Sequence, residues 1–361
     1  MPLNNMIIFE SSPDLSDNAE ALYRYFVEKK VNETYKIVWL CNKPFNEVLT
    51  ANNVLCLHRN ADDVLTQIRV LYVLMRAKFI FDSNAFVGLQ RRDQVRVHLG
   101  HGMPIKAVKE YCRTAGQMNE ILVTSSFFND IYEDLFNVNK TQILNIGLPR
   151  NDYLLKEYPI KKQLFGDKKI VFWLPTYRQH RNGNKSVRMG SKLNFGLPCI
   201  ETKDQLDRLV ETAKQNNWMI LFRIHPAQDQ SFLQTSTNEW LCNVNDEFLS
   251  QHQLKLYEVL GMSDALITDY SSVYYDFLLT DRPIALTIDD LEEYSQTFKI
   301  ALDYQKYIKA QYIYQYDHLL NFMQNMQVDA KQDIAKHMFH DYVEGQCCER
   351  LYNHLRTKYH F

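Results

Sequence analysis

Residues 264–273 read DALITDYSSV, the pattern of a strand that ends in a tight loop and passes into a helix. The apolar run Ala265–Thr268 is a strand candidate, and Ser271 and Ser272 then stand where helix-capping residues are preferred. Strands that alternate with helices build parallel sheets through crossover connections. This stretch therefore predicts an α/β fold.

The same alternation of short β-rich runs and helical patterns covers most of the chain. Strand candidates of the first half are Met6–Phe9, Lys36–Cys41, Phe79–Phe81, Val95–Leu99, Ile121–Thr124 and Ile143–Ile146. Those of the second half are Lys169–Leu174, Trp218–Ile224, Trp240–Val244, Ala265–Thr268 and Ile284–Ile288. From His318 the pattern is helical to the end. Two Rossmann-like sheets are therefore predicted.

The length of 361 residues corresponds to about two domains of ~150 residues each. The polar stretch 151–168, which contains Pro159, is the best boundary between them. We expect an N-terminal domain over residues 1–155 and a second domain over residues 156–317. Residues 318–361 are expected to form closing helices that pack across both domains.

Composition excludes several classes of protein. The apolar fraction of 46% and the charged fraction of 23% are ordinary for a globular chain, and the net charge of −2 gives no global reason to bind nucleic acid. Anion binding must therefore be local. The cysteines form no CxxC pair, which favours reduced thiols in a cytosol and argues against zinc; they are Cys41, Cys56, Cys112, Cys199, Cys242, Cys347 and Cys348.

The amino terminus has no basic leader followed by a long apolar stretch, so we expect neither a signal peptide nor a membrane anchor, and a cytoplasmic location. The apolar segment Ile68–Phe81 contains basic residues and falls short of the ~20 apolar residues that a bilayer needs. A helix presenting Leu71, Leu74 and Met75 beside arginines would suit a membrane interface. The alternative is an ordinary core helix that leads into a buried strand.

Ligands of open α/β sheets bind at the carboxyl ends of the strands. One loop at this edge contains Gly100-His101-Gly102. The flanking glycines allow close backbone approach to a ligand, and a histidine titrates near neutrality, so His101 is a candidate general base. The alternative is a turn histidine bonded to nearby backbone.

Candidates also follow the strands of the second half. His225, next to Pro226, could face His101 across an interdomain cleft and hold phosphate, or it could be structural. Ser271 and Ser272 could bind an anion at a helix start, or they could be simple caps with Asp269 as a structural acceptor. The stretch from Pro175 to Lys192 has basic residues and no acidic one, which makes it either a mobile anion-binding loop or a merely solvated one; the basic residues are Arg178, Arg181, Lys185, Arg188 and Lys192.

Several familiar signatures are absent, among them Walker A, GxGxxG, HExxH, GxSxG and DxD. His337 and His340 could in principle bind a metal, but no third ligand is evident. We therefore expect anion chemistry that uses no metal and no cofactor.

Taken together, the loops resemble those of the CDP-glycerol glycerophosphotransferase family, whose members prime or polymerise teichoic acid and related capsules. In the first half the resemblance rests on Phe9-Glu10-Ser11, Asp17-Asn18, Leu22-Tyr23, His101-Gly102, Pro104, Lys106, Gly147, Pro149-Arg150 and Asp152. In the second half it rests on Leu174–Arg178, His225-Pro226, Thr268–Ser272, Asp276-Phe277, Gly345 and Arg350. Met103 departs from the family, which usually has threonine there, and we expect no long amino-terminal extension of the kind that many polymerases carry.

The resemblance implies a GT-B-like fold, with two Rossmann-like domains facing a cleft. It also implies a reaction in which an acceptor hydroxyl attacks the β-phosphate of a CDP-alditol and releases CMP. His101 and His225 would be catalytic. The donor would be held by Thr176, Arg178, Pro226, Asp269, Ser271 and Ser272, and the acceptor or its phosphate would contact Gly102, Lys106 and Arg150.

We therefore expect an enzyme that transfers glycerol phosphate, or a related polyol phosphate, to a sugar or polyol-phosphate acceptor. In the family this acceptor is usually lipid-linked, which allows peripheral contact with the inner membrane face. One alternative is a GT-B glycosyltransferase that uses a nucleotide sugar. Another, of a different class, is a non-catalytic subunit that binds a CDP ligand or serves as a scaffold.

Overall fold

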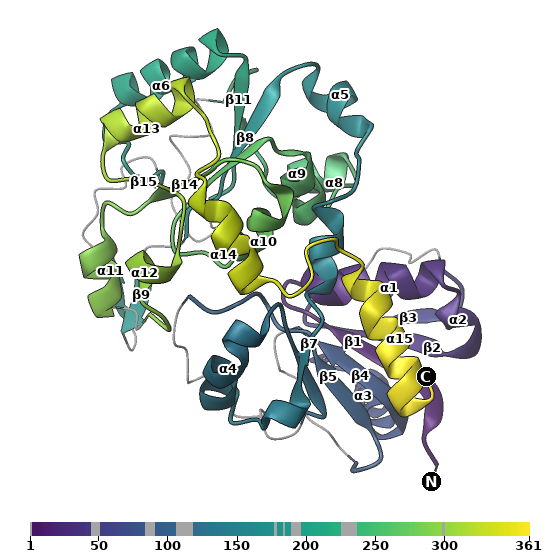
Figure 1. The fold of residues 1–361 in the computed structure, drawn as a ribbon. Coiled ribbons are helices and arrows are strands. Elements are labelled where there is room, and N and C mark those ends of the chain that lie inside the picture. Colours follow the sequence, from purple (N-terminus) through teal and green to yellow (C-terminus); the bar gives the residue numbers. More distant parts are fainter. Residues whose placement is uncertain are drawn as a thin grey trace. The chain divides into compact units, whose positions relative to one another are not determined.

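The computed structural model describes residues 2–44, 51–83, 91–105, 118–176, 179–182, 185–188, 196–224, 237–297 and 300–361. The chain forms two compact units, drawn in Figure 1. The first unit comprises Met1–Met103, Val108–Asp152 and Met338–Phe361, and the second comprises Pro104–Ala107 and Tyr153–His337. The first unit is therefore built from both ends of the chain.

The first unit contains a seven-stranded parallel sheet in the order β3-β2-β1-β4-β5-β6-β7. Its strands are β1 (Asn4–Glu10), β2 (Lys36–Cys41), β3 (Val54–His58), β4 (Ala77–Asp82), β5 (Val95–His98), β6 (Glu120–Val123) and β7 (Ile143–Asn145). Its α-helices are α1 (Asp17–Glu28), α2 (Val31–Thr34), α3 (Val64–Arg76), α4 (Asn129–Phe136) and α15 (Cys347–Tyr359). The strand order reverses between β1 and β4, which is the usual ligand-binding point of such sheets.

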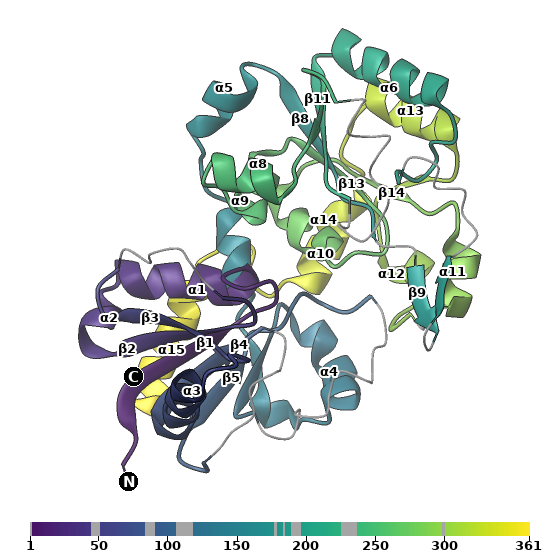
Figure 2. The ribbon, with the colours of Figure 1, turned by 180° about the vertical axis from the view of Figure 1, so that it is seen from behind.

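Successive side chains of β1 point to opposite faces of this sheet, so β1 contributes to the core on both sides. Ile8 packs with Val70 and Val73 of α3, which lies on the viewer's side of the sheet in Figure 2. Phe9 points to the other face, where its ring stacks on Trp39 with the centroids 5.2 Å apart. The helices α1 and α15 contact each other on that face, seen in front in Figure 1.

The second unit repeats this topology with a six-stranded parallel sheet, β12-β11-β8-β13-β14-β15. Its strands are β8 (Lys169–Trp173), β11 (Trp218–Phe222), β12 (Leu241–Asn243), β13 (Ala265–Thr268), β14 (Ile284–Thr287) and β15 (Gln311–Ile313). Its α-helices are α5 (Ile160–Phe165), α6 (Lys203–Gln215), α8 (Asp246–Gln251), α9 (Leu256–Met262), α10 (Val273–Phe277), α11 (Leu291–Thr297), α12 (Tyr304–Tyr307) and α13 (Tyr316–Gln324), and α14 (Lys331–Phe339) follows. Here the order reverses between β8 and β13.

The core of the second unit lies between its sheet and the neighbouring helices α6 and α13. Leu209 of α6 and Phe322 of α13 belong to the same buried cluster as Trp173 and Ile220 of the sheet. A separate antiparallel ribbon is formed by β9 (Gln179–Asn182) and β10 (Lys185–Arg188).

The prediction of an α/β fold with two parallel sheets is confirmed. Every strand candidate corresponds to a strand, with ends that differ by at most two residues. β3 and β15 were not predicted. Both are edge strands: β15 is only three residues long, and the apolar run of β3, Val54–Leu57, is short and partly exposed. The β9–β10 ribbon was predicted as a loop because its residues are mostly polar, although Asn182-Gly183 is typical of a hairpin turn.

Candidate functional site

His101 stands on a loop whose backbone only glycine readily forms. The loop follows β5, and Gly100 and Gly102 have φ angles of +72° and +108°. Because side chains with a Cβ atom rarely adopt such angles, the two glycines hold His101 at the apex of a tight turn. The imidazole is 61% exposed. The ring is therefore fixed at its base and accessible at its tip.

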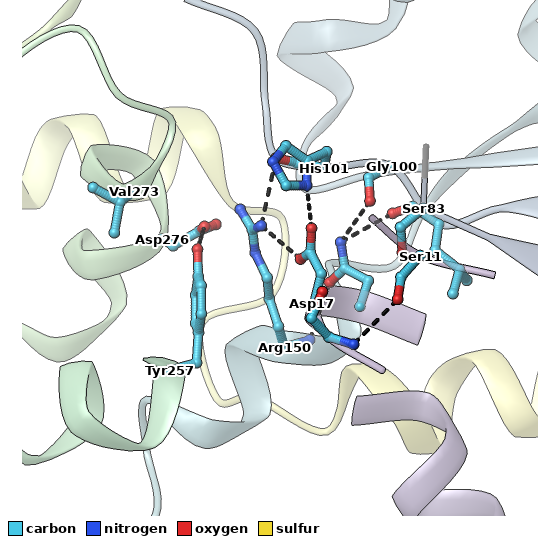
Figure 3. A network of polar contacts seen from close by, with 12 residues as sticks. Ser11, Asp17, Ser83, Gly100, His101, Arg150, Tyr257, Val273 and Asp276 are labelled. Carbon is cyan, nitrogen blue, oxygen red and sulfur yellow. Dashed lines mark hydrogen bonds and ion pairs between the residues drawn. The ribbon is translucent and has the colours of Figure 1, made fainter. Parts of the chain in front are cut away.

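Asp17 links His101 to Arg150, as Figure 3 shows. One carboxylate oxygen bonds His101 Nδ1, and the other accepts a hydrogen bond from Arg150 Nη1 at 2.7 Å. A carboxylate is an acceptor, so Nδ1 carries the proton and Nε2 is left as the basic nitrogen. This is the arrangement of an oriented general base.

The environment of Asp17 keeps it ionised. Its side chain is only 6% exposed, and burial alone would raise its pKa. The charges of the Arg150 guanidinium and the His101 imidazole overcome that effect and hold the pKa of Asp17 well below its ordinary value. The φ of Asp17 is +61°, a left-handed conformation that non-glycine residues rarely adopt.

Asn18 joins the loops that carry His101 and Arg150. Its Nδ2 donates to the carbonyl oxygens of Leu99 at 3.2 Å and Gly100 at 2.9 Å, and its Oδ1 accepts from Arg150 N at 3.1 Å. The amino end of α1 thus fixes both loops at the carboxyl edge of the sheet.

Asp17 and Asn18 begin helix α1, but neither residue occupies its capping position. The capping position belongs to Ser16, and the side chains of Asp17 and Asn18 serve the neighbouring loops instead. Asp17 is a functional residue that sequence reasoning missed. The available signal was an acidic residue in the loop after β1, at the edge where ligands bind.

A buried polar layer lies at the ends of β1, β4 and β5. Asp82 accepts from Arg96 Nε at 2.6 Å and pairs with His98 Nδ1 at 2.5 Å, and all three side chains are almost fully buried. Burial alone would raise the pKa of Asp82, but the charges and hydrogen bonds of His98 and Arg96 lower it. These contacts link the ends of β4 and β5, and the His101 loop departs from β5.

Glu10, the last residue of β1, lies opposite Asp82 in the strand register. It is fully buried, and neither of its carboxyl oxygens has a hydrogen-bond partner among the described residues. Burial raises its pKa to about 8, with Asp82 and Asp14 adding to the rise while Arg59 and Arg96 oppose it. Glu10 is therefore protonated at neutral pH.

In the second unit, Asp269 organises the edge at which the strand order reverses. Its two carboxylate oxygens each accept from Thr176 N at 3.0 Å, and one also accepts from Tyr270 N at 2.6 Å. Tyr304 Oη donates to the Asp269 carbonyl at 2.8 Å. Asp269 thus ties the loop after β8 to the loop after β13.

Ser271 and Ser272 follow Asp269 and are both half-exposed. Ser271 Oγ accepts a long bond from Val273 N at 3.4 Å, whereas Ser272 makes no side-chain capping bond to α10. Behind them Tyr257 Oη donates to Asp276 at 2.6 Å, also drawn in Figure 3. Both serines stand on the loop after β13, which Asp269 ties to Thr176 at the switch point of the second sheet.

The predicted site residues within the described ranges thus form two groups, one in each unit. In the first unit Asp17 joins His101 to Arg150, and Gly102 adjoins them. In the second unit Asp269 brings Thr176 to the loop of Ser271 and Ser272. The remaining predictions lie outside the described residues; they are Lys106, Arg178, His225 and Pro226.

Within the described part of the chain, no group of three or more histidine, cysteine, aspartate or glutamate side chains could hold a metal ion. His337 is exposed on α14, whereas His340 is buried beyond the end of that helix at Phe339. None of the helices in the described part of the chain is both long and apolar enough to cross a bilayer.

Comparison with known proteins assigns the family. The model of the family described as CDP-glycerol:poly(glycerophosphate) glycerophosphotransferase matches residues 2–357. The teichoic acid poly(glycerol phosphate) polymerase of Bacillus spizizenii is 26% identical over 331 residues, covering 83% of this chain and 78% of that protein. In Staphylococcus aureus, the teichoic acid glycerol-phosphate transferase is 23% identical, covering 97% of this chain and 92% of that protein. The ribitol-phosphate polymerase TarL is 22% identical, and the match spans 97% of this chain but only 62% of TarL.

Solved structures share the fold. The wall teichoic acid polymerase TagF superposes with a TM-score of 0.77 at 20% identity, covering 98% of this chain and 89% of that one. A putative UDP-N-acetylglucosamine 2-epimerase from Listeria monocytogenes gives a TM-score of 0.56 at 11% identity, covering 99% and 97%. At such identities the likeness shows the fold alone, and it confirms the predicted GT-B-like class.

The family match spans nearly the whole chain. The predicted enzyme class, a glycerophosphotransferase of the teichoic acid type, is thereby confirmed. The chain belongs to the CDP-glycerol:poly(glycerophosphate) glycerophosphotransferase family.

Proposed function

We propose that this chain transfers glycerol phosphate, or a related polyol phosphate, from its CDP derivative to a hydroxyl of a sugar or polyol-phosphate acceptor. The family description supports a glycerophosphate donor. Relatives are named for both glycerol phosphate and ribitol phosphate. One TagF structure comes from a crystal soaked with CDPG, which supports a cytidine diphosphate donor.

His101 is the proposed general base, and its contact with Asp17 is the observation that carries the proposal. As the acceptor oxygen forms its bond to the β-phosphorus, its proton passes to His101 Nε2. The bond from that phosphorus to the oxygen bridging to the α-phosphate breaks, and CMP leaves with the electron pair. Asp17 does not touch the substrate in this scheme. It is a positioning residue that stabilises the imidazolium.

Arg150 and Gly102 complete the acceptor side of the proposal. Arg150 is only 4% exposed, and its Nη1 is bonded to Asp17. It therefore acts mainly by holding Asp17 in place. Gly102 allows the turn that presents His101, and Lys106 remains a proposed acceptor contact from the family resemblance.

The donor diphosphate is assigned to the loops after β8 and β13 in the second unit. Thr176, Ser271 and Ser272 are half-exposed there and offer hydroxyl donors at a sheet edge that typically binds ligands. Asp269 holds these loops together through backbone hydrogen bonds, so its role in the proposal is positioning. His225, Arg178 and Pro226 join the proposed donor site from the family resemblance alone.

The acceptor is proposed to be lipid-linked, with the protein in peripheral contact with the inner membrane face. No cofactor or metal enters the reaction. Positive side chains and backbone NH groups would stabilise the charge of the leaving phosphate.

The test compares purified wild type with His101→Ala, supplied with CDP-glycerol or CDP-ribitol and an acceptor, while CMP release is measured. We expect His101→Ala to lower kcat by about 10²–10⁴-fold, the usual effect of removing an acid–base group, with donor affinity largely kept. His337→Ala is the matched control, because this histidine is exposed on α14.

Other outcomes would select the alternatives. Release of a nucleoside diphosphate from a nucleotide sugar would identify a glycosyltransferase. Binding of CDP-glycerol without turnover of any acceptor, unchanged by His101→Ala, would identify a binding subunit.

A further inference from the structure

Three buried tyrosines pack around the loop that carries Ser271 and Ser272. Tyr270 belongs to this loop, Tyr294 to α11 and Tyr304 to α12, and they are 1%, 0% and 4% exposed. The two helices lie beside each other in Figure 1. We call these three residues the tyrosine cluster.

The rings of the tyrosine cluster pack against one another. Tyr270 stacks on Tyr294 with the ring centroids 3.7 Å apart, and it meets Tyr304 edge-on at 5.5 Å. Stacked and edge-to-face rings attract each other beyond the gain from burial alone. A buried ring that is packed on two sides has little freedom to turn. The backbone of Tyr270, directly before Ser271, is therefore anchored by its own side chain.

Hydroxyl groups of the cluster fasten the same loop to its neighbours. Tyr304 Oη donates to the Asp269 carbonyl at 2.8 Å, and Tyr270 Oη donates to Asp290 Oδ1 at 2.8 Å. The Asp290 carbonyl accepts from Tyr294 N at 2.8 Å. The loop is thus bound to α12 through its backbone and to the start of α11 through a side chain.

Tyr304 remains a hydrogen-bond donor throughout the neutral range. Burial raises the pKa of its phenol well above the ordinary value of 10, and the negative charge of Asp269 adds to the rise. A phenol can donate to a carbonyl, whereas a phenolate cannot. The contact between Tyr304 and the loop therefore does not change with pH near neutrality.

Asp269 is held from a second direction as well. Its carboxylate accepts from Thr176 N after β8, while its carbonyl accepts from Tyr304. Residues 269–272 are thereby tied to the loop after β8, to the start of α11 and to α12. A loop that is ordered before its ligand arrives loses less conformational entropy on binding.

We propose that Tyr304 and Tyr270 are positioning residues of the donor site, which hold Ser271 and Ser272 in place before the CDP-alditol binds. This inference rests on the proposed function, which assigns the two serines to the donor diphosphate. Both tyrosines are almost fully buried, so they act through the loop and do not touch the substrate. Weakening their contacts should raise the Kd for the donor. A purely structural role would lower stability and leave that Kd unchanged.

The experiment measures the binding of CDP-glycerol to the full chain by isothermal titration calorimetry, and kcat by CMP release at saturating donor. Tyr304→Phe removes the hydroxyl and keeps the ring. We expect the Kd to rise about 3–10-fold, the effect of one lost hydrogen bond, while kcat changes less than about threefold. Tyr270→Phe, which removes the bond to Asp290, should raise the Kd by a similar factor.

Tyr316→Phe is the matched control. Tyr316 Oη donates to the Gln205 carbonyl, also at 2.8 Å, and joins α13 to α6 in the same unit. The variant loses the same kind of hydrogen bond between two helices that the proposal does not assign to the donor site. Tyr304→Phe and Tyr316→Phe should both lower the thermal unfolding midpoint by a few degrees. Only Tyr304→Phe should bind CDP-glycerol more weakly.

Two results would overturn the inference. One is wild-type affinity for CDP-glycerol in folded Tyr304→Phe. The other is an equal loss of affinity in Tyr316→Phe, because the effect would then come from a general loosening of the unit.

The wild type tests the proposed function separately. If it binds CDP-glycerol but releases no CMP with any acceptor, the transfer reaction is contradicted, and weaker binding by Tyr304→Phe still supports the positioning role. If the wild type does not bind CDP-glycerol, both proposals are contradicted.

Discussion

At the scale of single residues, Asp17 determines what His101 can do. In the proposed mechanism, the carboxylate selects the tautomer with Nε2 as the base and stabilises the charged ring after proton transfer. An amide in its place can donate to the ring as well as accept from it, so the wrong tautomer becomes available.

We therefore expect Asp17→Asn to lower kcat by about 10²-fold or more, while the KM for the CDP-alditol changes only a few-fold. The pH–rate profile should also change, because the charge that stabilises the imidazolium is lost. Steady-state kinetics across pH measure both effects. Asp246→Asn, at an 82% exposed side chain, is the control. Full activity of Asp17→Asn would contradict the assigned role.

Glu10 makes stability depend on pH. Its pKa is about 8 in the folded protein, above the ordinary value of 4.5, so the folded state holds a proton that the unfolded state releases. The stability this proton contributes is fully present below pH 4.5 and is lost as the pH rises towards 8. The carboxylate that then forms has no hydrogen-bond partner among the described residues.

Glu10→Gln imitates the protonated form and should remove this loss. Urea unfolding at pH 5 and pH 9 should show the wild type losing on the order of 2–5 kcal/mol more than the variant between these values. Glu157→Gln, at an exposed position, should keep the pH dependence of the wild type. If the free energy of unfolding changes with pH equally in the wild type and in Glu10→Gln, then Glu10 is ionised in the folded protein.

At the scale of elements, the segment after β7 anchors the amino end of α15. Asp152 accepts from Cys347 N at 2.7 Å and from Cys348 N at 3.0 Å, and Arg350 Nε donates to the Ile146 carbonyl at 3.0 Å. The motif Gly147, Pro149-Arg150, Asp152 therefore has two roles. Arg150 belongs to the site, and Asp152 caps a helix.

Gly147 lets that helix approach closely. Its φ is +86°, and a Cβ atom would lie 2.6 Å from Cys347 Sγ. Gly166 has a φ of +66° with no atom within 4 Å of its Cβ position. An alanine at Gly166 therefore measures the free-energy cost of the backbone conformation alone, without a steric clash. We expect Gly166→Ala to cost about 1 kcal/mol and Gly147→Ala about 2–4 kcal/mol, measured by denaturant unfolding. Equal losses would show that close packing at Gly147 is unimportant.

At the scale of the whole molecule, the carboxyl end of the chain completes the core of the first unit. The ring of Phe361 stacks on Tyr35 with the centroids 4.9 Å apart and also contacts Phe26 and Phe79. The last helix, α15, packs on α1. The first unit is therefore finished only after the second has been synthesised.

Deletion of residues 347–361 should open the first unit alone. Hydrogen exchange followed by mass spectrometry should show faster exchange in β1, β2 and β4, with protection kept in β8, β11 and β13. Phe361→Ala should give a weaker form of the same pattern, with a loss of about 2–3 kcal/mol. Equal loss of protection in both sheets would contradict independent cores.

The parallel sheets were predictable because buried strands carry continuous apolar runs, and because turns at their carboxyl ends carry proline, glycine and capping residues. His101 was predictable for the same reason, since its flanking glycines are visible in the chain. Short edge strands such as β15 were not predicted, because a strand at the edge of a sheet can form with few apolar residues.

Local patterns in the amino-acid sequence were sufficient for the fold class, the positions of most strands along the chain and the family motifs. Only tertiary packing decided that Asp17 pairs with His101 and Arg150. The same is true of Glu10, which is buried with no hydrogen-bond partner for its carboxyl group among the described residues. These residues lie far apart in the chain, and their contacts depend on which strand ends the sheet brings together. The pKa of a carboxyl group follows from its neighbours and its burial, which local sequence does not record.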